Sequence, residues 1–185
     1  MKKENTVMYI LRLTVTLLLI CSVVALALAG VNAITKDKIA AIKAEKTQKA
    51  IQAVLPGAVK VEEVNFTDAS GLVTKVYQDL ATGYAVEVAP NGFGGAITMM
   101  VGVSVDGKVM GISIISHAET PGLGAVAGAN TDKGVAFRDQ FEGLLAGITI
   151  GDGDNQIDAL SGATITSQAI VDGVNAALDC VKNMG

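Results

Sequence analysis

The sequence is poor in the residue types that most catalytic and metal sites use. Its 185 residues include no tryptophan, one histidine and two cysteines, and aromatic residues make up 4% of it. Cys21 and Cys180 are too far apart in the sequence to indicate a cluster that holds zinc or an iron–sulfur centre. No serine and aspartate stand at a spacing from His117 that indicates a hydrolase triad. The sequence therefore offers neither a triad nor a cysteine-based metal site.

Two further binding motifs are incomplete. The glycine-rich stretches lack the lysine of a phosphate-binding loop that ends in GK[ST]. A calcium-binding EF-hand loop that starts at Asp152 needs glycine at its sixth position and glutamate at its twelfth, where the sequence has Ile157 and Ala163. We therefore interpret residues 151–155 (GDGDN) as an acidic turn.

A long uncharged run lies near the N-terminus. The 22 residues from Leu13 to Ile34 would span about 30 Å as a helix, which matches the core of a bilayer. A cleaved signal peptide is an alternative, because residues 27–29 and 31–33 resemble cleavage sites, but this run is longer than the usual apolar region of such peptides. A lipoprotein signal is disfavoured because Ile20 precedes Cys21, where a small residue is needed. We predict a retained transmembrane helix over residues 13–34.

Charge is unevenly distributed around this run. Three basic residues precede it, and five lysines follow it between residues 36 and 49. Because the more basic flank of a membrane span usually stays in the cytoplasm, a simple count of positive charges would place the domain on the cytoplasmic side. That count carries little weight for a large translocated domain, so charge alone leaves the orientation open. From residue 50 onward, 15 acidic and six basic residues give a formal charge of −9. Such a domain would repel nucleic acid, which we do not expect as a partner.

The rest of the chain alternates between strand-like and helix-like patterns. Residues 35–57 are predicted to form a helical stalk that ends at Pro56-Gly57, and residues 58–185 to form one domain. The pair Asp106-Gly107 is a strong hairpin signal. Strands are expected at 60–66, 83–89, 96–105, 108–116 and 148–150, helices at 133–145 and from residue 164 onward, and residues 72–80 are ambiguous. This order predicts an α+β fold with a mixed or antiparallel sheet and flanking helices.

The stretch from Asp158 to Thr164 (DALSGAT) stands where the last helix is expected to begin. The first turn of a helix has unbonded N–H groups and a positive dipole end, and both attract phosphate. Gly162 and Ala163 are small enough for a phosphoryl group to reach the hydroxyl of Thr164, which could carry a phosphate ester. Capping of the helix by Asp158, Ser161 or Thr164 would explain the same polar cluster without any ligand.

Two upstream segments are candidates for the rest of a ligand site. Phe93 stands between glycines and could stack on a planar ligand or fill a hydrophobic gap. His117 follows the predicted strand 108–116, where a histidine is more often a structural hydrogen-bonding residue than a catalyst. The segment from Glu119 to Gly124 (ETPGLG) contains a turn and a glycine that permits close backbone approach. It fits either a tight connection or a ligand-facing loop.

Together these motifs resemble the FMN-binding domain family. DALSGAT resembles its flavinylation motif Dxx(S/T)GAT, in which the final threonine carries FMN through a phosphodiester bond. GFGG at 92–95 and ETPGLG at 119–124 also resemble that family. With one N-terminal membrane span, the chain resembles the G subunits of Rnf complexes, which are ferredoxin:NAD oxidoreductases that pump Na⁺ or H⁺. The C subunits of Na⁺-translocating NADH:quinone oxidoreductases are a related alternative, although their chains are usually longer.

The resemblance implies a site and a set of partners. FMN would be covalently bound at Thr164, installed from FAD by a flavin transferase, with Ser161, Gly162, Ala163 and Asp158 completing the motif. Less specifically, the flavin would have as neighbours Phe93, His117, Glu119, Thr120, Gly122 and Leu123. The partners would be other membrane subunits of the complex, between which this subunit would relay electrons without turning over a substrate alone.

The resemblance also implies a place in the cell. Residues 1–12 would lie in the cytoplasm, and the FMN-binding domain would lie on the extracytoplasmic side of the cell membrane. Two other interpretations remain open at this point. The chain could be a membrane-anchored protein that binds a ligand noncovalently, or a scaffold subunit in which SGAT only caps a helix.

Overall fold

The computed structural model describes residues 6–58 and 60–184. Residues 1–5 of the predicted cytoplasmic segment, and residues 59 and 185 of the predicted domain, lie outside the described residues. The chain divides into two compact units, Met1–Glu45 and Lys46–Gly185. Helix α1 (Thr6–Val54) begins in the first unit and ends in the second, two residues before Pro56.

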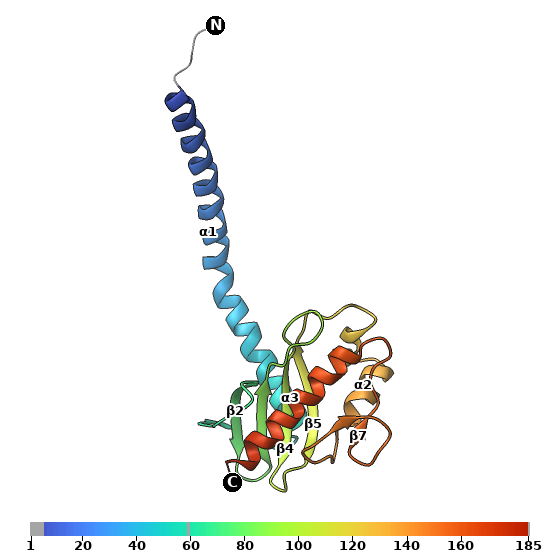
Figure 1. Ribbon diagram of the computed structural model, residues 1–185. Coiled ribbons are helices and arrows are strands. Elements are labelled where there is room, and N and C mark those ends of the chain that lie inside the picture. Colours follow the sequence, from blue (N-terminus) through green and yellow to red (C-terminus); the bar gives the residue numbers. More distant parts are fainter. Residues whose placement is uncertain (1–5, 59, 185) are drawn as a thin grey trace. The chain divides into compact units, whose positions relative to one another are not determined.

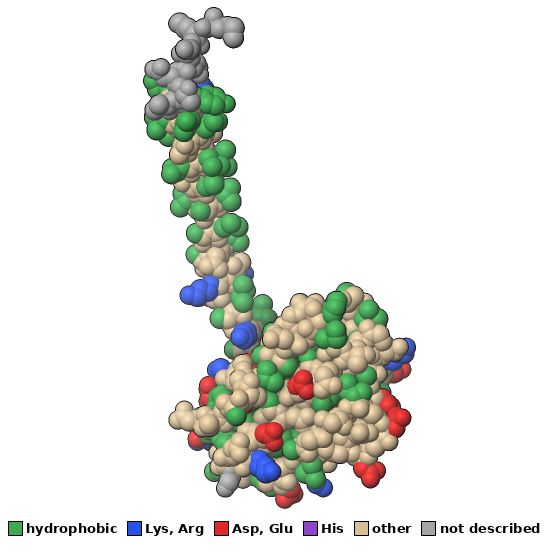
Figure 2. Space-filling model, viewed as in Figure 1, with side chains coloured by type: hydrophobic (Ala, Val, Ile, Leu, Met, Phe, Trp, Pro, Cys, Tyr) green, Lys and Arg blue, Asp and Glu red, His purple; other side chains and the backbone are tan. Residues whose placement is uncertain are grey.

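In the first unit, α1 exposes apolar side chains on all sides. The large hydrophobic residues described between Met8 and Ile34 are each at least 52% exposed. Figure 2 shows many green side chains on the upper part of this helix and blue lysine or arginine side chains toward its lower end. Such a helix is unfavourable in water and suited to a bilayer. Within the described residues, one helical stretch, Met8–Val54, is long and apolar enough to cross a membrane.

The second unit is built on a five-stranded antiparallel sheet whose strands neighbour one another in chain order. Residues 72–80, which were ambiguous in sequence, form its second strand, and the other four strands lie within two residues of their predicted bounds. The predicted α+β fold is therefore confirmed, and the main sheet is purely antiparallel. The strands are β1 (Glu62–Val64), β2 (Val73–Asp79), β3 (Gly83–Val88), β4 (Thr98–Ser104) and β5 (Val109–Ser116).

Shorter elements connect β5 to the final helix. They are the 3₁₀ helix η1 (Gly124–Gly128), α2 (Asp132–Asp139), the short parallel pair β6 (Thr149–Ile150) and β7 (Gln156–Ile157), and α3 (Thr164–Lys182). The parallel pair accounts for the strand expected near residue 150.

The predicted helix over 133–145 is too long. Helix α2 ends at Asp139, and the chain then turns to pair with the start of β5: Gly143 N–H donates to the Val109 carbonyl, and Val109 N–H donates to the Leu144 carbonyl. These hydrogen bonds to β5 outweigh the preference of residues 140–145 for a helix. Phe137 and Phe141 are nevertheless buried against each other, with ring centroids 5.6 Å apart.

Helix α3 covers one face of the sheet and forms the main core with it (Figure 1). Its apolar residues recur three or four positions apart, so that one stripe of the helix meets the sheet. Alternate residues of β3 and β4, including Val86 and Val101, point to this stripe. The buried residues of the stripe include Ile170, Val174, Ala177, Leu178 and Val181.

The end of α1 packs on the opposite face of the same sheet. Leu55 and Val54, both 1% exposed, join a second buried cluster with Ala85 and Met100. Gly102 lies directly beneath this helix end, and a Cβ atom there would overlap the Val54 carbonyl oxygen. The second unit therefore has three layers, with the sheet between α3 and the last turns of α1.

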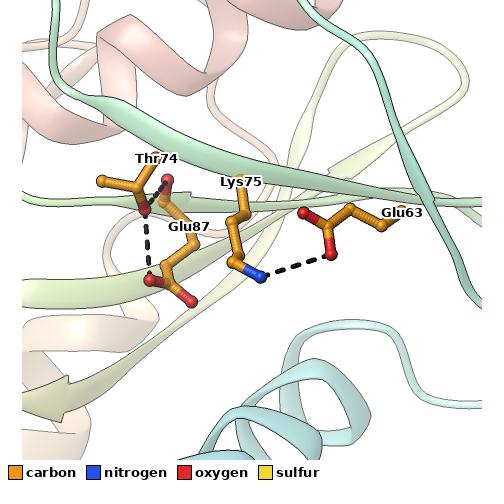
Figure 3. A network of polar contacts seen from close by, with 4 residues as sticks. All are labelled: Glu63, Thr74, Lys75 and Glu87. Carbon is orange, nitrogen blue, oxygen red and sulfur yellow. Dashed lines mark hydrogen bonds and ion pairs between the residues drawn. The ribbon is translucent and has the colours of Figure 1, made fainter.

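A polar network runs across β1, β2 and β3 of the sheet (Figure 3). The Thr74 hydroxyl donates to both the carboxylate and the carbonyl of Glu87, in each case at 3.1 Å. Lys75 pairs with Glu63 of β1 at 3.2 Å. Glu87 is buried, so its hydrogen bond offsets the cost of removing that carboxylate from water. The exposed pair of Lys75 and Glu63 adds little stability.

The three-layer packing predicts that Leu55→Ala destabilises the second unit by about 2–5 kcal/mol, because it empties a fully buried position. Leu80→Ala is the matched control, since Leu80 is 90% exposed and its truncation should change stability by no more than about 0.5 kcal/mol. The measurement is denaturant unfolding of the full chain in detergent, followed by circular dichroism. Equal effects of the two substitutions would contradict the packing of α1 on the sheet.

Candidate functional site

The N-terminus of α3 is open. Ala163 occupies the N-cap position, and no side chain within the described residues accepts a hydrogen bond there. The first three N–H groups of the helix, from Thr164 to Thr166, likewise have no acceptor among the described residues. The interpretation that Asp158, Ser161 or Thr164 caps the helix is therefore wrong. The helix start presents free donors and the positive end of its dipole.

Neighbouring polar groups are used elsewhere. Ser167 donates to the Ala163 carbonyl at 3.1 Å and accepts from Leu160 N–H at 2.9 Å, which holds the turn that precedes the helix. Gly162 has a φ of 73°, a value that favours glycine. A Cβ atom there would lie 3.2 Å from the Leu123 side chain, so the absence of a side chain at Gly162 allows Leu123 to pack close to this turn.

A cleft of about 400 Å³ opens beside this helix start. Its size lies within the range of small-molecule sites. Three of its apolar side chains are well exposed: Phe93 at 71%, Ile165 at 58% and Leu123 at 43%. Thr164 is exposed as well, so its hydroxyl is accessible from the cleft. The lining residues are Phe93, Glu119, Thr120, Leu123, Gly124, Gly162, Ala163, Thr164, Ile165 and Thr166.

One buried carboxylate joins the walls of the cleft. Glu119 is 6% exposed, and its Oε1 accepts from Gly94 N–H at 2.8 Å while its Oε2 accepts from the Thr166 hydroxyl at 2.5 Å. Its own N–H donates to Nδ1 of His117 at 3.2 Å. His117 therefore supports the Glu119 backbone, and it does not line the cleft itself.

The structure brings together most of the residues singled out in the sequence. Phe93, Glu119, Thr120, Leu123 and the Gly162–Thr164 stretch line the cleft, whereas Ser161 and Gly122 lie in adjoining turns. Asp158 lines a separate acidic hollow with Asp152 and Asp154, and its N–H donates to the Gln140 side chain at 2.7 Å.

Three lining residues were absent from the predicted site: Gly124, Ile165 and Thr166. Gly124 belongs to the ETPGLG motif, and the whole of that motif could have been included. Ile165 and Thr166 directly follow the predicted attachment residue, and their position in the first helical turn was the available signal.

The cleft suits a ligand with one anionic end and one planar apolar part. No lysine or arginine lines it among the described residues, so the N–H groups and dipole of α3 are its means of binding an anion. The apolar side chains of Phe93, Leu123 and Ile165 provide surfaces for a flat ring. FMN has a phosphate and an isoalloxazine ring, and the donor set present here therefore fits it.

Comparison with known proteins places these residues in a described family. The family model of the FMN-binding domain matches residues 92–179, a range that includes every residue that lines the cleft. The G subunit of the Na⁺-translocating ferredoxin:NAD⁺ oxidoreductase complex of Acetobacterium woodii is 32% identical, over 95% of this chain and 93% of its own. The G subunit of the proton-translocating ferredoxin:NAD⁺ oxidoreductase complex of Clostridium ljungdahlii is 33% identical, over 98% of this chain and 96% of its own.

A third relative extends this similarity. The G subunit of the ion-translocating oxidoreductase complex of Methanosarcina acetivorans is 33% identical, over 94% of this chain and 95% of its own. Among solved structures, the C subunit of the Na⁺-translocating NADH-quinone reductase of Parabacteroides distasonis aligns with a TM-score of 0.45 at 21% identity, over 57% of this chain and 58% of its own. The near full-length similarities carry the assignment: the chain belongs to the family of G subunits of ion-translocating oxidoreductase complexes, with an FMN-binding domain over residues 92–179.

Proposed function

We propose that this chain is the FMN-carrying electron-transfer subunit of a membrane complex that couples electron flow from ferredoxin to NAD⁺ with ion translocation, and that FMN is attached to Thr164. The names of its relatives support the complex, and the matched domain supports FMN. The observation that favours attachment is the exposed hydroxyl of Thr164 at the first position of an uncapped helix. A flavin that cycles between oxidised and reduced forms would supply the redox chemistry.

Attachment would form a phosphodiester. In this step the Thr164 oxygen bonds to the flavin-side phosphorus of FAD, the pyrophosphate bond breaks, AMP leaves, and the hydroxyl proton is lost. A flavin transferase is the expected catalyst. The N–H groups of Ile165 and Thr166 would stabilise the phosphate charge, and the small side chains of Gly162 and Ala163 would leave room for the phosphate oxygens.

Asp158 has a different proposed role. It is exposed outside the cleft, and a carboxylate beside the bound phosphodiester would repel it. We therefore assign its place in the motif to recognition by the transferase.

The other lining residues would hold the ring. Phe93, Leu123 and Ile165 offer apolar surface, and their own exposure leaves the cleft accessible to a redox partner. The formal charge of −9 from residue 50 onward disfavours a soluble anionic partner, so partners within the membrane complex fit better. The helix that ends at Val54 would anchor the domain at the membrane and raise its effective concentration near those partners.

The relatives bear on the alternatives. One relative at 32% identity is named as Na⁺-translocating, and one at 33% identity is named as proton-translocating. The similarity therefore does not indicate which ion is coupled. Their near full-length match favours the ferredoxin-linked complex over the NADH:quinone oxidoreductase. A noncovalent ligand-binding protein would release its flavin on acid precipitation, whereas the proposed ester would retain it.

The attachment predicts that Thr164→Ala abolishes covalent FMN and leaves the fold stable within about 0.5 kcal/mol, because the Thr164 hydroxyl caps nothing. The full chain is coexpressed with a flavin transferase, and intact mass shows whether one FMN less one water has been added. Thr67→Ala is the matched control, since Thr67 is an exposed threonine outside both the motif and the cleft, and it should keep the adduct. Flavin retained by the Thr164→Ala variant after denaturation would place the ester elsewhere.

The proposed orientation puts the FMN-binding domain on the extracytoplasmic side, with residues 1–12 in the cytoplasm. It predicts that Leu80→Cys, at a position 90% exposed, reacts with a membrane-impermeant maleimide in intact cells. Asn5→Cys should react only after lysis. Burial raises the pKa of the Cys180 thiol, and Cys21 lies within the predicted membrane span, so both native thiols should react slowly with this reagent. Labelling of the Asn5→Cys variant in intact cells, with none of the Leu80→Cys variant, would reverse the orientation.

A further inference from the structure

Glu119 is placed at the meeting point of three segments. It belongs to the loop that follows β5, its Oε1 accepts from Gly94 in the loop after β3, and its Oε2 accepts from Thr166 in the first turn of α3. A buried carboxylate is costly unless it is well hydrogen-bonded, and both oxygens of this one are engaged. The interaction therefore joins parts of the chain that are remote in sequence.

The surrounding glycines make room for this carboxylate. A Cβ atom at Gly92 would lie 2.5 Å from Glu119 Oε1, and one at Gly124 would lie 2.6 Å from Oε2 and would overlap the Thr166 hydroxyl oxygen. At Gly94 a Cβ atom would overlap the Ala118 carbonyl oxygen. Larger residues at these positions would displace the carboxylate or the backbone that carries it.

The segments that Glu119 joins carry two important residues of the cleft. Phe93 immediately precedes Gly94, and Thr164 lies two residues before Thr166. Both line the cleft, and both side chains are exposed, so neither is fixed by burial in the core. The hydrogen bonds of Glu119 thus connect the wall that holds Phe93 to the helical turn that holds Thr164.

We propose that Glu119 is a positioning residue, which clamps the glycine-rich loop 92–95 to the first turn of α3 and thereby fixes the flavin ring relative to its point of attachment. The effect on the flavin rests on the proposed attachment of FMN to Thr164. The clamp itself consists of hydrogen bonds within the chain and does not require flavin. Without the clamp, FMN would remain attached while the ring lost a fixed environment.

The test compares three ways of changing the clamp in the full chain. Glu119→Ala removes it, and Thr166→Val removes the donor to one oxygen. Glu119→Gln should preserve it, because the amide oxygen accepts from Gly94 N–H and the amide nitrogen donates to the rotated Thr166 hydroxyl. Thr82→Val is the matched control, since the Thr82 hydroxyl donates to Asp79 at 2.6 Å in the turn between β2 and β3, and neither residue lines the cleft.

The first readout uses the flavinylated protein. Glu119→Ala and Thr166→Val should keep the mass of attached FMN, lose the flavin circular dichroism of the wild type, and lower its fluorescence anisotropy. Glu119→Gln should retain both signals. Thr82→Val should lower the unfolding midpoint with both flavin signals unchanged. The double variant Glu119→Ala/Thr166→Val should add little to Glu119→Ala alone, because both substitutions break the same interaction.

The second readout does not need flavin. The chain has no tryptophan, so Phe93→Trp provides a single fluorescent reporter in the glycine-rich loop. In protein made without the transferase, adding Thr166→Val or Glu119→Ala should lower the tryptophan anisotropy and increase its quenching by acrylamide. Adding Glu119→Gln or Thr82→Val should leave both unchanged.

The outcomes separate the two proposals. A wild type without covalent FMN contradicts the attachment, and the tryptophan readout then decides on the clamp alone. Wild-type flavin and tryptophan signals in Thr166→Val would overturn the clamp, as would flavin signals that change equally in Thr82→Val. If Glu119→Ala does not fold, the contrast between Thr166→Val and Glu119→Gln still decides.

Discussion

The site depends on three backbone N–H groups at the start of α3 that have no acceptor among the described residues. A capping side chain there is ordinarily worth about 1 kcal/mol. The chain places Ala163 at that position, and the turn before it requires Gly162 at a positive φ. Local stability is thus given up at the helix start, where an anionic group can supply the missing acceptor.

The helix can remain uncapped because its stability comes from packing. The stripe that includes Ile170 and Val174 is buried against the sheet, and the other face of that sheet is covered by the end of α1. A long, well-packed helix holds its first turn in a fixed place, and a site on such an element is more precise than one on loops alone. The Phe93 loop is joined to this first turn through Glu119, which accepts from Gly94 N–H and from the Thr166 hydroxyl.

Much of the domain could be predicted from local sequence patterns, and the exceptions have physical reasons. Strands β3 to β5 follow from alternation and the Asp106-Gly107 turn, because these signals lie within a few residues of one another. The early end of α2 could not be predicted in this way, since it depends on hydrogen bonds to Val109 of β5. The pairing of Glu119 with Thr166 joins distant parts of the chain, and a single sequence carries no signal for it.

The absence of lysine and arginine from the described lining of the cleft has a consequence for how the cofactor would be retained. A pocket that captures free FMN must supply the whole binding free energy, and cationic side chains are a common source of it. A flavin attached at Thr164 would instead face the cleft at the high local concentration set by a short tether. Occupancy would then be decided when the bond is made. The cleft walls would be free to vary in shape and polarity without loss of the cofactor, so selection on this domain could act on the flavin's redox properties independently of affinity.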